Sequence, residues 1–189
     1  MSEFLLDAVS AGDVDRVRRL LAAGADCNER NSDGATALML AAHAGKLDMV
    51  ETLIEAGAQV NATDGRGWSP LMKAAYNADL DRGFADVAQA LIDAGANVEA
   101  PIGYGVRPLM LAAGYGETAV VETLLRAGAE VLARNDGGLT ALMMVKQKHY
   151  VDVINLLHEA EREVGVGEGS CSTTNAPGSR VVTFLKPPK

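Results

Sequence analysis

Apolar and polar residues along the chain follow a pattern that returns at nearly fixed intervals. Pairs of the type Gly-Ala recur 33, 38 and 33 residues apart, and so do tetrads of the type Thr/Ser/Arg-Ala/Pro-Leu-Met. The pairs begin at Gly24, Gly57, Gly95 and Gly128, and the tetrads begin at Thr36, Ser69, Arg107 and Thr140. Self-similarity at a fixed period predicts an array of like units, one of which carries five extra residues.

Each unit predicts two short helices. Thr36 or Ser69 can cap the first helix with its hydroxyl, and a proline such as Pro70 suits the first helical position because no backbone donor is lost there. The second helix opens with an acidic residue and carries an apolar stripe. The repeated glycine ends this helix, since glycine adopts the left-handed conformation without steric cost. We therefore expect helix–turn–helix units joined by loops.

These residues resemble the ankyrin-repeat family, whose units read Thr-Pro-Leu-His-x-Ala-Ala, then Gly, then Val-x-x-Leu-Leu-x-x-Gly-Ala-x-x-Asn. The resemblance covers about residues 3–161 and implies an all-α solenoid of helix–turn–helix units with finger loops between them. We expect an ankyrin-repeat domain over residues 1–164, with five units at about 1–30, 31–63, 64–101, 102–134 and 135–164.

Two departures from the family pattern carry structural expectations. Where the family has a histidine that bonds between repeats, this chain has methionine, so apolar packing is expected to replace a polar link. The positions are Met39, Met72, Met110 and Met143. The last unit has Lys146 and Glu161 where earlier units have Ala and Gly, which is typical of a capping unit. We expect its second helix to continue to Gly165.

Composition narrows the function classes. The 189 residues are 48% hydrophobic but only 4% aromatic, which indicates a core of small aliphatic side chains. Seventeen basic and 25 acidic residues give a formal net charge of −8, the wrong sign for a protein that binds nucleic acid. The chain has no leader pattern and no run of 18 apolar residues, so we expect a cytoplasmic protein that does not enter membranes.

Candidate chemistry is sparse. His43, His149 and His158 fall in separate units, and neither a phosphate-binding glycine loop nor a nucleophile elbow occurs. Cys27 and Cys171 lie far apart without any Cys-x-x-Cys motif, so neither a zinc site nor a disulfide framework is predicted. We expect no enzyme activity, no cofactor and no metal.

The aromatic residues are the most informative group. Five of the eight lie between positions 68 and 115, and none occupies a repeated scaffold position. Rigid rings at variable positions of a stiff scaffold are typical anchors for a partner. The resemblance implies that finger tips and first helices line a concave groove that binds proteins. We predict these partner-binding residues, aromatic anchors first and polar rim second: Trp68, Tyr76, Tyr104, Tyr115, Asp33, Arg66, Asn77, Arg107 and Asp136.

A second interpretation of the rings stays open. The five-residue insertion lies within Ala78–Gly83, and Trp68 and Tyr104 could simply cover the gap that it creates. For the function itself, we expect a module that binds a protein with a basic or amphipathic surface. The alternatives are a regulatory inhibitor or assembly factor of one enzyme, and a self-assembling structural protein.

Residues 165–189 differ in composition from the units and are expected to form a C-terminal tail. The tail carries a charge of +2 against −10 for the rest of the chain, and it contains the apolar pentad Val181–Leu185 flanked by Arg180 and Lys186. Such a segment can dock on the acidic groove of its own chain, pair with a second copy, or add as a strand to another protein. It can equally be a free end whose charges and prolines guard against aggregation.

Overall fold

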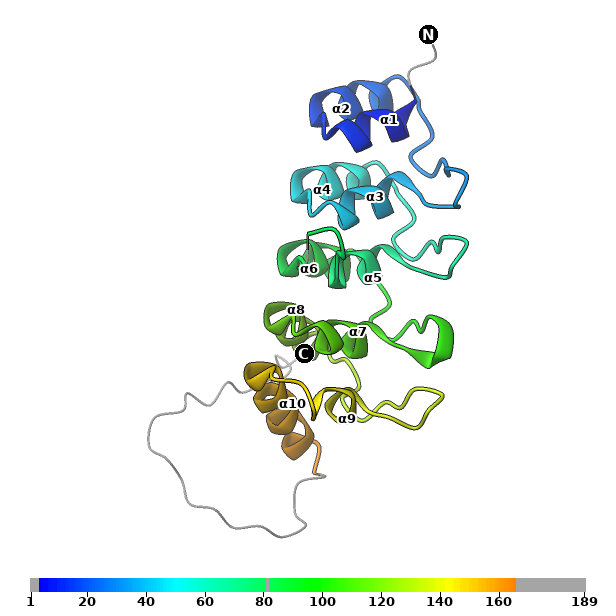
Figure 1. Ribbon diagram of the computed structural model, residues 1–189. Coiled ribbons are helices and arrows are strands. Elements are labelled where there is room, and N and C mark those ends of the chain that lie inside the picture. Colours follow the sequence, from blue (N-terminus) through cyan, green and yellow to red (C-terminus); the bar gives the residue numbers. More distant parts are fainter. Residues whose placement is uncertain (1–3, 81, 166–189) are drawn as a thin grey trace.

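The computed structural model describes residues 4–80 and 82–165, in which ten α-helices stack as five consecutive pairs (Figure 1). A single 3₁₀ turn, η1, spans Gly103–Gly105 within this part of the chain. The helices are α1 Leu5–Ala11, α2 Val14–Ala22, α3 Ala37–His43, α4 Leu47–Glu55, α5 Pro70–Ala75, α6 Ala85–Asp93, α7 Pro108–Tyr115, α8 Thr118–Arg126, α9 Ala141–Val145 and α10 Val151–Glu163. The expected all-α solenoid is confirmed.

The helices form two layers. The first helices of the pairs (α1, α3, α5, α7 and α9) pack on one another in order. The second helices form another layer on the side of the first layer that faces away from the connecting loops (Figure 1). The loops that connect one pair to the next project from the side of the first layer as long fingers (Figure 1). Each helix pair therefore buries its apolar side against the pairs next to it.

The first helices begin where the sequence predicts. The hydroxyls of Thr36, Ser69 and Thr140 accept hydrogen bonds from the backbone N–H groups three residues later, which satisfies a donor that the helix itself leaves unpaired. Pro70 and Pro108 occupy first helical positions. Arg107 stands at the same position of the fourth pair but makes no cap hydrogen bond with its side chain.

Small residues set the distance between the pairs. Ala41-Ala42, Ala74-Ala75 and Ala112-Ala113 are all completely buried, so the first helices approach closely. Met39, Met72 and Met110 are buried as well, as expected for methionines that pack between neighbours. A core of Ala, Leu, Val and Met explains how the chain folds with so few aromatic residues.

Two expectations about the last pair need correction. Met143 does not pack like its counterparts but is 44% exposed, because no further pair covers that side of α9 within residues 4–80 and 82–165. The helix α10 ends at Glu163 rather than at Gly165, and Gly165 follows in the left-handed conformation with φ of 83°. At 13 residues α10 is nevertheless longer than the nine-residue second helices before it. The predicted tail lies outside the described residues except for Gly165.

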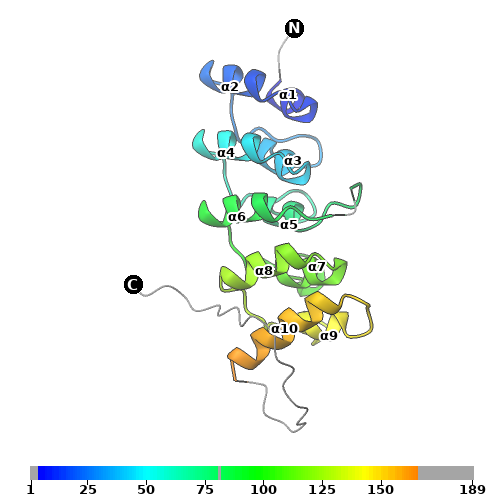
Figure 2. The ribbon, with the colours of Figure 1, turned by 90° about the vertical axis from the view of Figure 1, so that its left-hand side faces the viewer.

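The insertion lengthens the turn between α5 and α6. This turn extends farther from the stack than the turns of the neighbouring pairs (Figure 2). At its end, the ring of Phe84 lies against Gly45 of the previous pair, where an added Cβ would come within 2.2 Å of a ring carbon. Phe84 is buried, so this aromatic residue anchors the enlarged turn to the scaffold.

Two glycine-to-alanine substitutions are expected to change stability in opposite directions. Gly57 has φ of 85°, and an added Cβ would meet no atom within 4 Å, so Gly57→Ala costs only the backbone strain of about 1–2 kcal/mol. Gly114 lies inside α7 with equal space around it, so Gly114→Ala is expected to add up to about 1 kcal/mol of helix propensity. Equilibrium unfolding in urea measures both. A midpoint of Gly57→Ala that equals or exceeds that of the wild type would disprove the left-handed helix stop as the reason for the repeated glycine.

Candidate functional site

The finger tips present different side chains at one repeated position. Asp33, Arg66 and Tyr104 each stand three residues before the residue that precedes the first helix of their pair, namely Thr36, Ser69 and Arg107. All three residues are exposed. This position carries an acid, a base and an aromatic ring in successive fingers, whereas the scaffold positions around it repeat. The side chains at the tips therefore vary while the backbone that holds them stays the same.

Backbone hydrogen bonds tie neighbouring tips together. The N–H of Gly65 donates to the carbonyl oxygen of Asp33 at 2.9 Å, and the N–H of Asp136 donates to that of Tyr104 at 3.0 Å. The carboxylate of Asp136 also lies against Gly105, where an added Cβ would come within 2.6 Å of Oδ1. Asp33 and Asp136 therefore hold adjacent fingers in place while both residues remain exposed.

Tyr104 is the most unusual residue among the tips. Its φ of 63° is the only positive φ of any residue other than glycine in the described parts of the chain. Its side chain is 86% exposed. A ring this exposed does not cover the gap that the insertion creates. The interpretation of Tyr104 as a residue that merely fills this gap is therefore wrong.

Trp68 belongs to a half-buried polar group at the base of its finger. The ammonium nitrogen of Lys73 lies 5.1 Å from the centre of the indole ring, and it pairs with a carboxylate oxygen of Asp64 at 3.0 Å. Trp68 is half-buried and packs against the core. Its ring is thus partly structural, because it covers an ion pair whose acidic partner is only 6% exposed.

The pKa of Asp64 follows from this environment. Burial alone raises the pKa of the carboxyl group, but hydrogen bonds from Lys73 and from the backbone N–H groups of Trp68 and Arg66 favour the charged form. The balance holds the pKa of Asp64 below its usual value of 3.8. Asp64 is therefore a charged structural residue of the finger at neutral pH.

A second aromatic group lies at the carboxyl ends of the first helices. The rings of Tyr76 and Tyr115 are stacked, with centroids 3.6 Å apart and an angle of 5° between their planes. The ammonium nitrogen of Lys148 lies 6.0 Å from the centre of the Tyr115 ring and 5.5 Å from that of Tyr150. The group spans the third, fourth and fifth helix pairs, and Tyr115 is 47% exposed.

The predicted anchors thus form two groups rather than one. The six residues of α5 separate Trp68, which precedes this helix, from Tyr76, which follows it. At 1.5 Å per residue the helix alone spans about 9 Å. Tyr104 stands apart from both groups at the tip of the next finger.

Two residues of the predicted polar rim are engaged inside the scaffold. Asn77 is only 3% exposed, and its side chain donates to the carbonyl oxygen of His43 and accepts from the N–H groups of Asp79 and Leu80. Arg107 pairs with Glu99 at 2.8 Å and with Glu130 at 3.2 Å. The assignment of Asn77 to an accessible rim needs correction, because its burial and its bonds fasten the enlarged turn to the previous pair.

Lys148 and Tyr150 were absent from the predicted set. A signal for Lys148 exists in the sequence, since it follows Tyr115 by the repeat interval of 33 residues and so lies next to it in the stack. Tyr150 has no such spacing. Its ring packs against Gly116, where an added Cβ would come within 2.8 Å of a ring carbon, and this contact emerges only from the three-dimensional structure.

Neither aromatic group includes a histidine. Nε2 of His43 is 3.4 Å from a carboxylate oxygen of Asp79 in the enlarged turn. In residues 4–80 and 82–165, no cluster of three or more His, Cys, Asp or Glu side chains could hold a metal ion. Within the same part of the chain, every helix is too short or too polar to cross a bilayer.

The regular stack, its finger loops and its buried Ala-Ala pairs agree with the comparison to known families. The sequence profile described as ankyrin repeats (3 copies) matches residues 5–102 and again residues 81–167. The chain belongs to the ankyrin-repeat family. Ankyrin repeats generally mediate protein–protein interaction, and the family is typically non-catalytic. No curated protein has a sequence that matches this chain significantly.

Removal of the buried charge where the second finger meets α5 is expected to destabilise the protein. Asp64→Asn leaves Lys73 without its partner, and we expect a loss of about 1–2 kcal/mol at pH 7. Because the pKa of Asp64 is lowered in the folded state, its contribution is complete above pH 3.8 and is lost as the pH falls below that value. Unfolding at pH 7 and at about pH 2.5 measures the difference between variant and wild type. An equal difference at both values would rule out the charge as its origin.

Proposed function

We propose that the five helix pairs act as five ankyrin repeats and that the chain is a non-catalytic module that binds a partner protein. The partner contacts a surface that we call the display face. It consists of the finger tips and of the two stacked rings that end α5 and α7: Asp33, Arg66, Tyr104, Asp136, Tyr76 and Tyr115. Trp68 and Arg107 support this face from beneath, and Asn77 lies outside it.

Tyr104 carries the proposal. A non-glycine residue in the left-handed region costs about 1 kcal/mol or more, and glycine would relieve that cost. Gly103 and Gly105 flank Tyr104, so the local sequence already provides a flexible tip. With 86% of its surface in solvent, the ring recovers none of this cost by burial in its own chain. Burial against a partner accounts for a large ring held in such a position.

The stacked rings of Tyr76 and Tyr115, at the ends of two first helices, provide a second contact region for the partner. Two parallel rings in contact present a rigid, amphipathic surface that loses little conformational entropy on binding. Lys148, in the fifth helix pair, places its ammonium group near the ring of Tyr115, and its side chain is exposed. The two rings therefore offer an apolar platform with a polar margin.

The charge of the face indicates the partner chemistry. Asp33 and Asp136 place carboxylates at the tips, and the whole chain carries a net charge of −8. Complementary charge steers association and excludes strongly acidic partners. A basic or amphipathic protein surface with one apolar projection toward Tyr104 fits this arrangement.

Substitution of Tyr104 tests the proposal. A tagged wild-type protein is used to isolate its partner from the source cells, and the affinity of the purified pair is measured by calorimetry. Tyr104→Gly is expected to weaken binding by about 1–3 kcal/mol, because an anchor is removed. Its free energy of unfolding is expected to stay equal or to rise, because glycine adopts a φ of 63° without strain.

The matched control is Glu51→Ala, an exposed residue of α4 in the other layer of the stack. This variant is expected to retain wild-type affinity. Full affinity of both Tyr104→Gly and Tyr115→Ala, or a loss in Glu51→Ala alone, would place the interface elsewhere.

A further inference from the structure

The polar links between successive second helices stop at the last pair. After α2, α4 and α6, a polar side chain accepts a hydrogen bond from a backbone N–H of the following pair. Asn28 accepts from Gln59 at 2.8 Å, Asn61 from Asn97 at 2.7 Å, and Glu99 from Glu130 at 2.8 Å. The equivalent residue after α8 is Leu132, which has no polar side-chain atom to accept one.

The reason lies in the end of α10. In the earlier pairs a glycine in the left-handed conformation follows the second helix. The turn after that glycine then donates a hydrogen bond to the turn of the preceding pair. Glu161 stands at that position in the last pair, so α10 continues to Glu163. The turn after α8 is thereby left without the segment that covers its counterparts.

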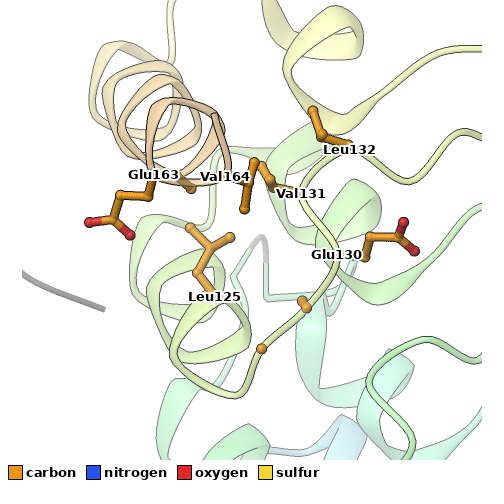
Figure 3. Close-up of a pocket in the computed structure, with 9 residues that line it drawn as sticks. Leu125, Glu130, Val131, Leu132, Glu163 and Val164 are labelled. Carbon is orange, nitrogen blue, oxygen red and sulfur yellow. The ribbon is translucent and has the colours of Figure 1, made fainter. Parts of the chain in front are cut away.

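An apolar pocket of about 450 Å³ occupies this place. Leu125, Val131 and Val164 face one another across it, with Glu130 on one side and Glu163 on the other (Figure 3). None of the nine described residues that line the pocket is basic. Val164 is 58% exposed, so the rim presents apolar surface to solvent. The pocket therefore suits an extended apolar segment with positive charges at its ends.

We propose that residues Val181–Leu185 of the same chain occupy this pocket, with Arg180 and Lys186 toward Glu163 and toward Glu130, which shares the single charge of Arg107 with Glu99 and so keeps this side acidic. The segment combines apolar residues with flanking bases, which matches the lining in both respects. The bound segment would cover the turn after α8, in the place that the turn of a following helix pair takes elsewhere in the stack.

The chain between the pocket and the segment is long enough to bring Val181–Leu185 back to the pocket. Val164 lines the pocket, and the chain leaves it at Gly165. Fifteen residues, 166–180, then precede the segment and can extend up to about 50 Å, far more than the return requires. The entropic cost of closing such a loop grows only slowly with its length. The pocket lies between the ends of α8 and α10 in the layer of second helices, so the proposal is independent of the display face.

Hydrogen exchange of the full chain, followed by mass spectrometry, tests this contact. Amides of residues 181–185 are expected to exchange at least about tenfold more slowly than in a random coil. Val164→Asp is expected to abolish this protection. Phe184→Asp is expected to abolish it too and to speed exchange at residues 130–132. Both changes place a charge in the apolar contact, and Val164 is exposed, so its substitution leaves the fold intact.

The matched control is Val151→Asp, the same change at the first residue of α10, which is 63% exposed and does not line the pocket. This variant is expected to keep the protection of residues 181–185. Exchange at random-coil rates in the wild type, or an equal loss of protection in the control, would overturn the proposal. Protection at about 100 µM that disappears at about 1 µM would also overturn it, since it would assign the pocket to the tail of a second copy.

Discussion

Each helix pair in this protein buries its apolar side only against the pairs beside it. The completely buried Ala-Ala pairs of α3, α5 and α7 bring the first helices close together, and Met39, Met72 and Met110 are buried as well. Stability then arises from interfaces between neighbours. The finger tips contribute little to those interfaces, so their side chains can vary without loss of the fold.

The same constraint explains what is different about the end of the stack. In the part of the chain that the structure describes, no pair follows the last one, and Met143, whose counterparts are buried, is 44% exposed there. The replacement of the helix-stopping glycine by Glu161 lengthens α10 and opens the pocket beside Leu132. The irregular features of the chain are thus concentrated where the repeat ends and where the insertion enlarges one turn.

The period of the sequence predicted much of this structure, because the caps and glycine stops that define the helices are local. It was less informative about how single side chains are used. The pattern identifies Asn77, Trp68 and Arg107 as variable, yet it carries no signal that Asn77 points inward, that Trp68 covers an ion pair or that Arg107 bridges two glutamates. Those roles depend on residues in other pairs, which come together only in the stack. The positive φ of Tyr104 was equally invisible, since glycines on both sides would have served the turn.

The account distinguishes a scaffold, stabilised by the interfaces between helix pairs, from a display face that consists of the finger tips and the stacked tyrosine rings. Chemical-shift mapping of the isotope-labelled protein, titrated with its purified partner, tests that separation most directly. The account predicts that the largest changes fall on the amides of Asp33, Arg66, Tyr104 and Tyr115, while the exposed side of α4 and α6 stays unperturbed. Changes confined to α4 and α6, with unaltered finger tips, would contradict it.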